Sequence, residues 1–153
     1  MPDLFTHYIA ARVPGAMVRD RRLLVLLVLG TFLPDLAAKG SNWLLRCGDY
    51  YPIASHSILG VFLLSYLACL FVAEPLRRNG FFMLAAGGLI HILDDMVNDN
   101  MGMGVIRPFL PFSPAGVEFG WIDPENVVLM IPIDAAILAL VLLLERRLGR
   151  VRQ

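Results

Sequence analysis

The residues best suited to chemistry in this chain are three histidines and several aspartates that interrupt long apolar stretches. His91 and Asp95 are four positions apart, so on a helix their side chains would share one face and could hold one metal ion. His7, Asp35 and His56 are the other candidate ligands. Imidazole and carboxylate together suit zinc, manganese or iron, and three protein ligands with one open position are usual at a catalytic zinc site.

Several of the aspartates also have explanations that need no metal. Asp94 would point about 100° away from the helix face of His91, so we expect it behind the ligands or in a loop. Asp35 follows a proline and could instead be a helix cap. Asp134 could be a single buried polar residue that a neighbouring helix holds. Asp99 completes the set of candidate carboxylates.

The composition indicates what surrounds these residues. Of the 153 residues, 58% are apolar and 17% are charged, against about 45–50% and about 25% in soluble proteins, and the mean hydropathy is +0.68. The 13 basic and 13 acidic residues cancel, so no net field attracts nucleic acid, and the apolar excess excludes a disordered chain. We predict one membrane-embedded domain over residues 1–153, in which Cys47 and Cys69 are structural.

Four stretches contain almost no charge and are candidates for membrane-spanning helices: 23–34, 50–73, 79–93 and 127–144. A transmembrane helix needs about 20 mostly apolar residues, with a range of about 17–25. The second and fourth stretches meet this length, and the first and third do so only with their polar ends included. We therefore predict an all-α fold, a polytopic membrane helical bundle of about four transmembrane helices plus a short N-terminal helix.

Arginines gather in three clusters beside these stretches, at 19–22, at 77–78 and in the tail at 145–153. With four crossings all three clusters fall on one face, which the positive-inside rule makes cytoplasmic. We therefore expect an integral membrane protein with cytoplasmic basic ends. The alternative, that 19–33 forms the basic and apolar regions of a signal peptide, is disfavoured because such a signal starts near the N-terminus.

The ionisable residues inside the apolar stretches lie at similar distances from these clusters. His7, Asp35, His91 and Asp134 each stand 12 or 13 residues from a cluster. Helices would place them about 18–20 Å from the basic face, in the outer part of a slab roughly 30 Å thick. His56 is 21 residues before the second cluster and is expected higher, at the mouth of the site, unless its helix tilts or ends early at Pro75. Because ionisable groups are costly in a bilayer, all five are candidates for function.

The connecting segments are expected to enclose this site. Residues 3–18 could form a partly inserted helix, antiparallel to the next one, that brings His7 to the level of Asp35. Pro75 and Gly80 predict a turn between the second and third spans. Residues 96–126 are rich in Gly, Pro, Asn and Phe and predict a long, ordered, non-cytoplasmic loop that covers the site.

Short segments along most of the chain resemble a known family. They are His7 in the first helix, Leu33-Pro34-Asp35-Leu36, His56-Ser57, His91-Ile92-Leu93-Asp94-Asp95, Phe109-Leu110-Pro111-Phe112-Ser113 and Phe119-Gly120-Trp121-Ile122. In order and spacing they are similar to the YdjM-like family, which is described as LexA-binding, inner-membrane-associated, metal-dependent hydrolases. The resemblance implies a place in the inner membrane, and an association with LexA is implied only by the family's description.

That family is in turn thought similar to the zinc-dependent phospholipase C and single-strand nuclease group, which are helical phosphodiesterases with a multinuclear zinc site. The likeness implies a similar helical core and a ligand set of His7, Asp35, His56, His91 and Asp95. The chain has no further histidine, so it could hold one or two divalent ions, first of all zinc, with manganese or iron as alternatives. It departs from the family at Ser55, where a threonine is usual.

By this resemblance the protein would be a metal-dependent hydrolase that acts through metal-activated water. Asp94 or Asp134 could act as general base, and Ser57 could orient a ligand or the substrate. A site near the outer edge of the bilayer suits an amphiphile, so the expected substrate is a lipid phosphoester, such as a phospholipid or an isoprenoid phosphate. The lipid bilayer is the other expected partner, and nucleic acid is not expected.

Two other functions stay open at this point. The protein could be a non-catalytic membrane protein in which the metal only joins the helices, which predicts a closed site of four ligands. It could also be a small transporter, because intramembrane Asp and His residues can relay protons. The oligomeric state is open as well.

Overall fold

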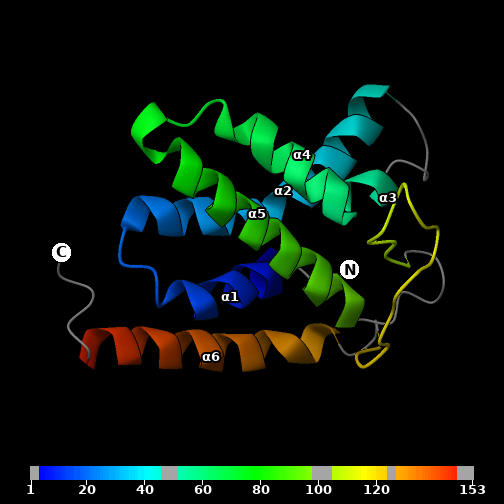
Figure 1. The fold of residues 1–153 in the computed structure, drawn as a ribbon. Coiled ribbons are helices and arrows are strands. Elements are labelled where there is room, and N and C mark those ends of the chain that lie inside the picture. The colour runs from blue at the N-terminus through cyan, green and yellow to red at the C-terminus, as the bar shows by residue number, and fades with distance from the viewer. Residues whose placement is uncertain (1–3, 46–51, 98–104, 124–126, 148–153) are drawn as a thin grey trace.

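The computed structural model describes residues 4–45, 52–97, 105–123 and 127–147. These residues form six helices, namely α1 (Leu4–Gly15), α2 (Arg21–Leu45), α3 (Pro52–Ser55), α4 (Ile58–Cys69), α5 (Glu74–Val97) and α6 (Val127–Arg147), shown in Figure 1. Within the described ranges, β structure is limited to isolated bridges such as the one between Ile106 and Val117. The predicted all-α class is therefore confirmed for this part of the chain.

α5 lies at the centre of the bundle and contacts α1, α2 and α4. α6 runs along the outer side of α1, so α1 is enclosed between α6 and the pair formed by α2 and α5 (Figure 1). Polar contacts join α1 to α6, because the Thr6 hydroxyl donates to Asp134 Oδ2 at 2.7 Å and Arg12 pairs with Glu145. These partners allow a helix that is only moderately apolar to be buried.

Two described helices are long and apolar enough to cross a membrane, α2 over Arg21–Leu44 and α5 over Glu74–Val97. α4 has only 12 residues, which corresponds to about 18 Å and falls short of a hydrocarbon core of roughly 30 Å. The predicted count of about four spans is therefore not confirmed, although the membrane-spanning character of α2 and α5 is supported.

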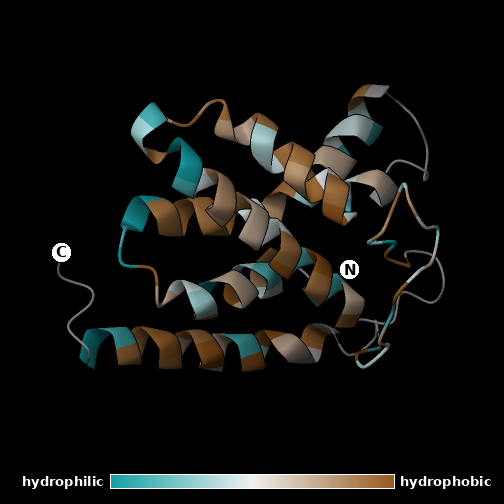
Figure 2. Ribbon diagram, viewed as in Figure 1, coloured by the Kyte–Doolittle hydropathy of each residue, from teal (hydrophilic) through white to brown (hydrophobic). Residues whose placement is uncertain are grey.

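The described residues combine several buried polar side chains with many exposed large apolar ones. His7 and His91 are completely buried, whereas Phe71, Leu67 and Leu143 on the outside are more than half exposed. Figure 2 shows mostly apolar residues along α4 and α6 and hydrophilic residues at the left-hand ends of α2, α5 and α6. Such an extensive apolar exterior is what contact with lipid chains requires.

The arginine-bearing helix ends lie together at one end of the bundle. These ends are the start of α2, the start of α5 and the end of α6, all on the left in Figures 1 and 2. Their basic residues are Arg21, Arg22, Arg77, Arg78, Arg146 and Arg147. The described part of the loop between α5 and α6, residues 105–123, lies at the opposite end (Figure 1). The predicted gathering of these clusters is confirmed for the described residues, and residues 148–153 of the basic tail lie outside them.

α2 and α5 approach each other closely at two glycines. A Cβ atom at Gly30 would lie 2.3 Å from the carbonyl oxygen of Leu84, and one at Gly87 would lie 2.1 Å from that of Leu27. Only glycine lets two helix backbones meet at this separation, as in other membrane helix pairs. The crossing fixes the segment of α2 that follows Gly30 against the segment of α5 that follows Gly87.

The turn predicted at Pro75 and Gly80 is wrong. α5 already begins at Glu74 and continues through both residues, and the chain reverses at 70–73 instead. Proline is tolerated in the first turn of a helix because the first N–H groups have no partner within the helix. The Cys69 thiol donates to the carbonyl oxygen of Arg77 at 2.8 Å and joins the two sides of the turn. Cys69 is thus structural, and Cys47 lies outside the described residues.

The loop after α5 starts later than the predicted 96–126, because α5 continues to Val97. Its described part, residues 105–123, returns to the helix ends through backbone hydrogen bonds. Phe119 N–H donates to the carbonyl of Met96, Trp121 N–H donates to that of Val97, and Ile58 N–H donates to that of Pro108. This part is ordered, as predicted, and it covers the end of α5 and the start of α4.

Candidate metal centre

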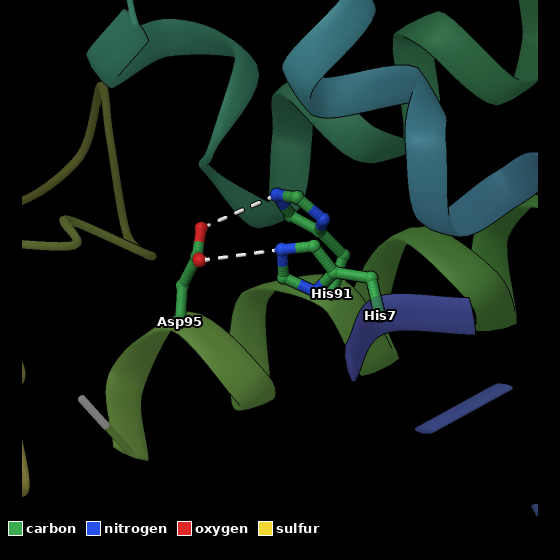
Figure 3. A group of neighbouring side chains, drawn as sticks. All are labelled: His7, His91 and Asp95. Atoms are coloured by element: carbon green, nitrogen blue, oxygen red, sulfur yellow. Dashed lines mark ion pairs between the residues drawn. The ribbon is translucent and has the colours of Figure 1, made fainter. Parts of the chain in front are cut away.

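The structure brings together all five side chains that the sequence nominated as ligands. His7 comes from α1, Asp35 from α2, and His91 and Asp95 from α5, while His56 lies between α3 and α4. Each is at most 4% exposed. They form two groups suited to a metal ion, one of His7, His91 and Asp95 and one of Asp35, His56 and His91, so His91 belongs to both. Figure 3 shows the first group, in which both imidazoles turn toward Asp95.

The Nε2 atoms of the three imidazoles face the carboxylates of Asp35 and Asp95. His91 and His56 stand 3.2 and 3.5 Å from Asp95 Oδ2, and His7 stands 3.7 Å from Asp95 Oδ1. Asp35 Oδ1 is 3.5 Å from His56 and 4.0 Å from His91. Two ligands of a tetrahedral zinc ion stand about 3.4 Å apart. The four distances of 3.5–4.0 Å therefore fit atoms that share a cation better than atoms that share a proton, for which about 2.7–3.2 Å is usual, and the 3.2 Å distance from His91 to Asp95 fits both.

The hydrogen bonding of His91 agrees with this. Its imidazole is fully buried, and neither ring nitrogen makes a hydrogen bond of acceptable geometry to the described residues. Asp35 Oδ1 is likewise buried and makes no hydrogen bond of acceptable geometry to the described residues. Buried polar atoms nearly always have a partner, and leaving one without a partner costs free energy. A divalent cation between these groups would satisfy them, so the residues present fit a metal ion.

Polar neighbours hold two of the imidazoles in this orientation. His7 Nδ1 lies 2.8 Å from Asp94 Oδ2, and His56 Nδ1 lies 3.0 Å from the Ser55 hydroxyl. The Ser55 contact on one ring nitrogen of His56 fixes the tautomer and leaves the other nitrogen for a metal, whereas Asp94 lies close to His7 without the geometry of a hydrogen bond. Asp94 thus stands behind a ligand, as its position on the helix predicted. Ser55 keeps the hydroxyl group of the threonine that is usual in the resembled family.

Lys39 is a part of the site that sequence reasoning missed. Its ammonium group donates to Asp35 Oδ2 at 2.6 Å, while most of its side chain is exposed. The contact engages one oxygen of Asp35 and leaves Oδ1 facing the histidines. The available signal was the spacing of Asp35 and Lys39, which are four residues apart and therefore neighbours on a helix.

The alternative explanation of Asp35, as a helix cap, is wrong. It is not a helix cap, because it lies well inside α2, which continues through Pro34 to Leu45. Proline removes a backbone hydrogen bond within a helix, and α2 changes direction in its middle part (Figure 1). The expectation that His7 and Asp35 lie at one level agrees with the cluster, although the two residues belong to different groups within it. The structure places His7 against Asp94 and Asp95 of α5, while Asp35 faces His56 and His91.

The higher position expected of His56 on a continuous helix is wrong, and the exception of a helix that ends early is nearer to the structure. Counting residues along one continuous helix placed it above the other ligands, but that helix is interrupted. The helix is interrupted at His56, between α3 and α4, and α4 ends after 12 residues. His56 therefore lies among the other ligands, 3.5 Å from both Asp35 and Asp95.

The other nominated residues lie around this cluster. Ser57 caps α4, because its hydroxyl donates to the carbonyl of Ala54 at 2.8 Å and accepts from Gly60 N–H at 3.0 Å. Its hydroxyl proton is thus used within the chain, and its role toward a ligand stays a prediction. Asp134 belongs to neither metal group and accepts the Thr6 hydrogen bond, as expected of a buried polar residue held by a neighbouring helix. Asp99 lies outside the described residues.

Residues 2–150 match the YdjM inner membrane protein family. The chain belongs to this family. Membership confirms the resemblance seen in the short segments, and with the two long apolar helices it supports a place in the inner membrane. Comparisons with curated proteins and with solved structures give no match. The similarity to zinc-dependent phospholipase C therefore stays a prediction.

The YdjM segments are distant in the sequence, but their ionisable residues meet in the fold. His7, Asp35, His56 and the pair His91 and Asp95 come from four separate segments and converge on the cluster. The two later segments, at 109–113 and 119–122, lie in the loop that covers the ends of α4 and α5.

Proposed function

We propose that the protein is a membrane-bound, metal-dependent hydrolase that acts on the phosphoester of a lipid or another amphiphile. The observation that carries the proposal is the cluster of three imidazoles and two carboxylates beside a mostly apolar pocket. Asp94 links the two, because it contacts His7 of the cluster and also lines the pocket. A hydrolytic site for an amphiphile needs both a polar reacting centre and an apolar channel next to it.

The pocket has a volume of about 210 Å³ and lies between α1, the end of α5, α6 and the covering loop. Its apolar wall includes Ile9, Ala10, Val13 and Ile137. Its polar lining residues are Thr6, Asp94 and Asp134. An acyl or prenyl chain would lie along α1 and α6, with its phosphate toward Asp94. Asp134, nominated as a general base, is thus placed in the pocket rather than among the metal ligands.

Charge determines how an anionic substrate could approach. Asp35, Asp94 and Asp95 carry three negative charges and Lys39 carries one positive charge, so these four residues alone repel a phosphate. One divalent cation would neutralise them and a second would make the site attractive to phosphate. Substrate binding is therefore expected to depend on the metal load, in line with the two groups that share His91.

The residues divide the work in the proposed reaction. The Nε2 atoms of the histidines and Oδ1 of Asp35, with Asp95, would hold the metal. A bound divalent metal lowers the pKa of water and polarises the phosphoryl oxygen. Asp94 holds the His7 ring, Lys39 holds Asp35, and the apolar walls exclude bulk water from the reacting phosphate.

The activity test compares wild-type protein with Asp94→Asn, both loaded with zinc or manganese in detergent micelles. The wild type should hydrolyse a chromogenic phosphodiester that carries a long alkyl chain. Asp94→Asn should be slower by about 10–100-fold, because the support of the His7 ligand is weakened. Gly40→Ala, at a position with no atom within 4 Å of the new Cβ, is the matched control and should keep the wild-type rate.

A second variant tests whether the pocket binds the acyl or prenyl chain of the substrate. Ala10→Phe would fill part of the cavity and should raise KM for a long-chain phosphodiester while a short-chain one is unaffected. If the metal-loaded wild type turns over neither substrate, and chelation only lowers its melting temperature, the metal is structural. A structural metal that joins the helices is the second candidate function, and it is favoured by the near-complete burial of all five candidate ligands.

We further propose four membrane crossings, by α2, the α3–α4 segment, α5 and α6, with the arginine-bearing ends cytoplasmic and the cluster toward the other face. The gathering of the arginines at one end of the bundle supports this orientation (Figure 2). The 21 residues of α6 correspond to about 31 Å, enough to cross. α4 is short and needs α3 and the adjoining turns to complete its crossing.

Single cysteines test this orientation in a background that carries Cys47→Ser and Cys69→Ser. Phe112→Cys, at an exposed loop position, should react with a membrane-impermeant maleimide in right-side-out vesicles. Arg147→Cys should react only after the vesicles are permeabilised. The opposite pattern would invert the orientation, and labelling of both positions from outside would exclude a membrane crossing by α6, the helix that separates them.

A further inference from the structure

A second cavity lies at the arginine-bearing end of the bundle, where α4 turns into α5. It has a volume of about 270 Å³, and its walls are Tyr66, Cys69, Leu70, Arg77, Arg78, Phe81 and Phe82. Arg78 and His91 are 13 residues apart on α5, which corresponds to about 20 Å. The cavity is therefore separate from the candidate metal centre.

The chain builds this cavity from a short turn. α4 ends at Cys69, α5 begins at Glu74, and the Cys69 thiol donates to the carbonyl of Arg77 across the turn. The ring centroid of Phe81 lies 6.1 Å from that of Phe62 on α4, so aromatic packing supports the wall on the α5 side. Two adjacent arginines in the second turn of α5 consequently stand at the rim of an apolar groove.

The charge at the rim is available to a ligand. Arg77 is 44% exposed and lies 4.0 Å from Glu74, which is 86% exposed. A contact this long between two exposed side chains is weak in water. Guanidinium groups bind phosphate oxygens through two parallel N–H donors, which a distant surface carboxylate does not replace.

The apolar wall continues onto the outer surface of the helices. Tyr66, Leu70 and Phe82 are each at least half exposed, and Phe71 beside them is 93% exposed. A water-soluble anion would leave this surface uncovered. A second copy of the chain, docked face to face, would bring its own pair of arginines to the same place. A phospholipid matches both the charged rim and the apolar wall, because its phosphate can bind the arginines while one acyl chain lies along the wall.

We infer that this groove is a binding site for an anionic phospholipid, whose headgroup phosphate is held by Arg77 and Arg78 and whose acyl chain lies against Leu70 and Phe82. Basic sites beside membrane helices attract anionic lipid, and the other arginine-bearing ends of α2 and α6 lie on the same side. The bound lipid would join the end of α4 to the start of α5. The inference does not depend on the proposed hydrolase activity.

The test measures lipid retained by the full-length protein in native mass spectrometry, with dioleoyl phosphatidylglycerol and dioleoyl phosphatidylcholine as the probes. The wild type should prefer phosphatidylglycerol by about tenfold. Arg77→Gln/Arg78→Gln should lose that preference. Arg146→Gln/Arg147→Gln, which removes the same charge from the same end of the bundle, is the matched control and should keep it.

Two further variants keep the result interpretable if the glutamine pair folds poorly. Arg77→Lys/Arg78→Lys should keep a reduced preference, and Leu70→Trp should lose bound lipid while both arginines remain. Equal losses in the two glutamine pairs would show general surface attraction and overturn the inference, as would displacement of the lipid by millimolar inorganic phosphate alone. Retention of the preference by His91→Ala would show that the groove acts independently of the metal centre.

Discussion

His91→Ala is expected to lose essentially all bound divalent metal, while the wild-type protein purified without chelator carries one or two ions per chain. His91 belongs to both metal groups, so its removal takes a ligand from each. Because a site with three protein ligands is left with two, the affinity should fall by orders of magnitude. Inductively coupled plasma mass spectrometry after dialysis against metal-free buffer measures the metal content.

His7→Ala distinguishes one ion from two. It removes a ligand only from the group of His7, His91 and Asp95 and leaves Asp35, His56 and His91 complete. With two ions, His7→Ala should keep about half of the wild-type metal. With a single ion shared by all five side chains, His7→Ala and His91→Ala should lose metal to similar extents.

Asp134→Asn is the matched control for these variants. Asp134 is as buried as Asp35, at 4% exposure, but it belongs to neither group and binds Thr6 instead. Its replacement should leave the metal content unchanged. A wild-type protein without metal, or a His91→Ala protein with the full load, would remove the metal centre and the proposed hydrolase with it.

Gly30→Ala is expected to destabilise the protein by about 3 kcal/mol, at the upper end of the usual range for overpacking. The added Cβ would lie 2.3 Å from the backbone oxygen of Leu84, so no side-chain rotation can relieve the clash and α2 must move away from α5. Gly87→Ala meets the oxygen of Leu27 at 2.1 Å and should behave alike. Thermal unfolding in detergent, followed by circular dichroism, should show a melting temperature about 10 °C lower.

Gly40→Ala gives the control for helix propensity, because it makes the same chemical change in the same helix. Nothing lies within 4 Å of its Cβ, so the variant should gain up to about 1 kcal/mol from the better propensity of alanine. Opposite signs at positions 30 and 40 would establish the close crossing of α2 and α5. Equal effects at the two positions would contradict it.

The crossing also supports the metal centre, which links the two predictions. Asp35 follows Gly30 on α2, and His91 follows Gly87 on α5, each by little more than one helical turn. When the helices separate, the 4.0 Å distance from Asp35 Oδ1 to His91 Nε2 must increase. Gly30→Ala should therefore lose metal affinity as well as stability, whereas Gly40→Ala should lose neither.

Some of this protein could be derived from the residues alone, because the relevant physics is local. The spacing of His91 and Asp95 places both on one face of α5 whatever surrounds that helix. The scarcity of charge in the apolar stretches predicts membrane helices, and it makes the few ionisable residues within them conspicuous. The five ligands that could be nominated in this way all lie in one cluster in the structure.

The partners within the cluster depend on how the helices cross, and no local pattern specifies this. Residue counting brought His7 to the level of Asp35 without specifying the partners of either, and it placed His56 higher because it assumed a continuous helix. The break at His56 and the contact at Gly30 and Gly87 decided both points. The turn expected at Pro75 failed for a related reason, since the same residue can break a helix or begin one.

The sequence by itself thus determined which residues lie in apolar surroundings and which arginines mark a common end. Only the tertiary structure decided that Asp94 supports His7, that Lys39 holds Asp35, and that Asp134 lines a pocket instead of the cluster. The physical reason is that burial and charge patterning are properties of single segments. Ligand geometry, in contrast, arises where side chains from four segments meet, at positions set by close backbone packing.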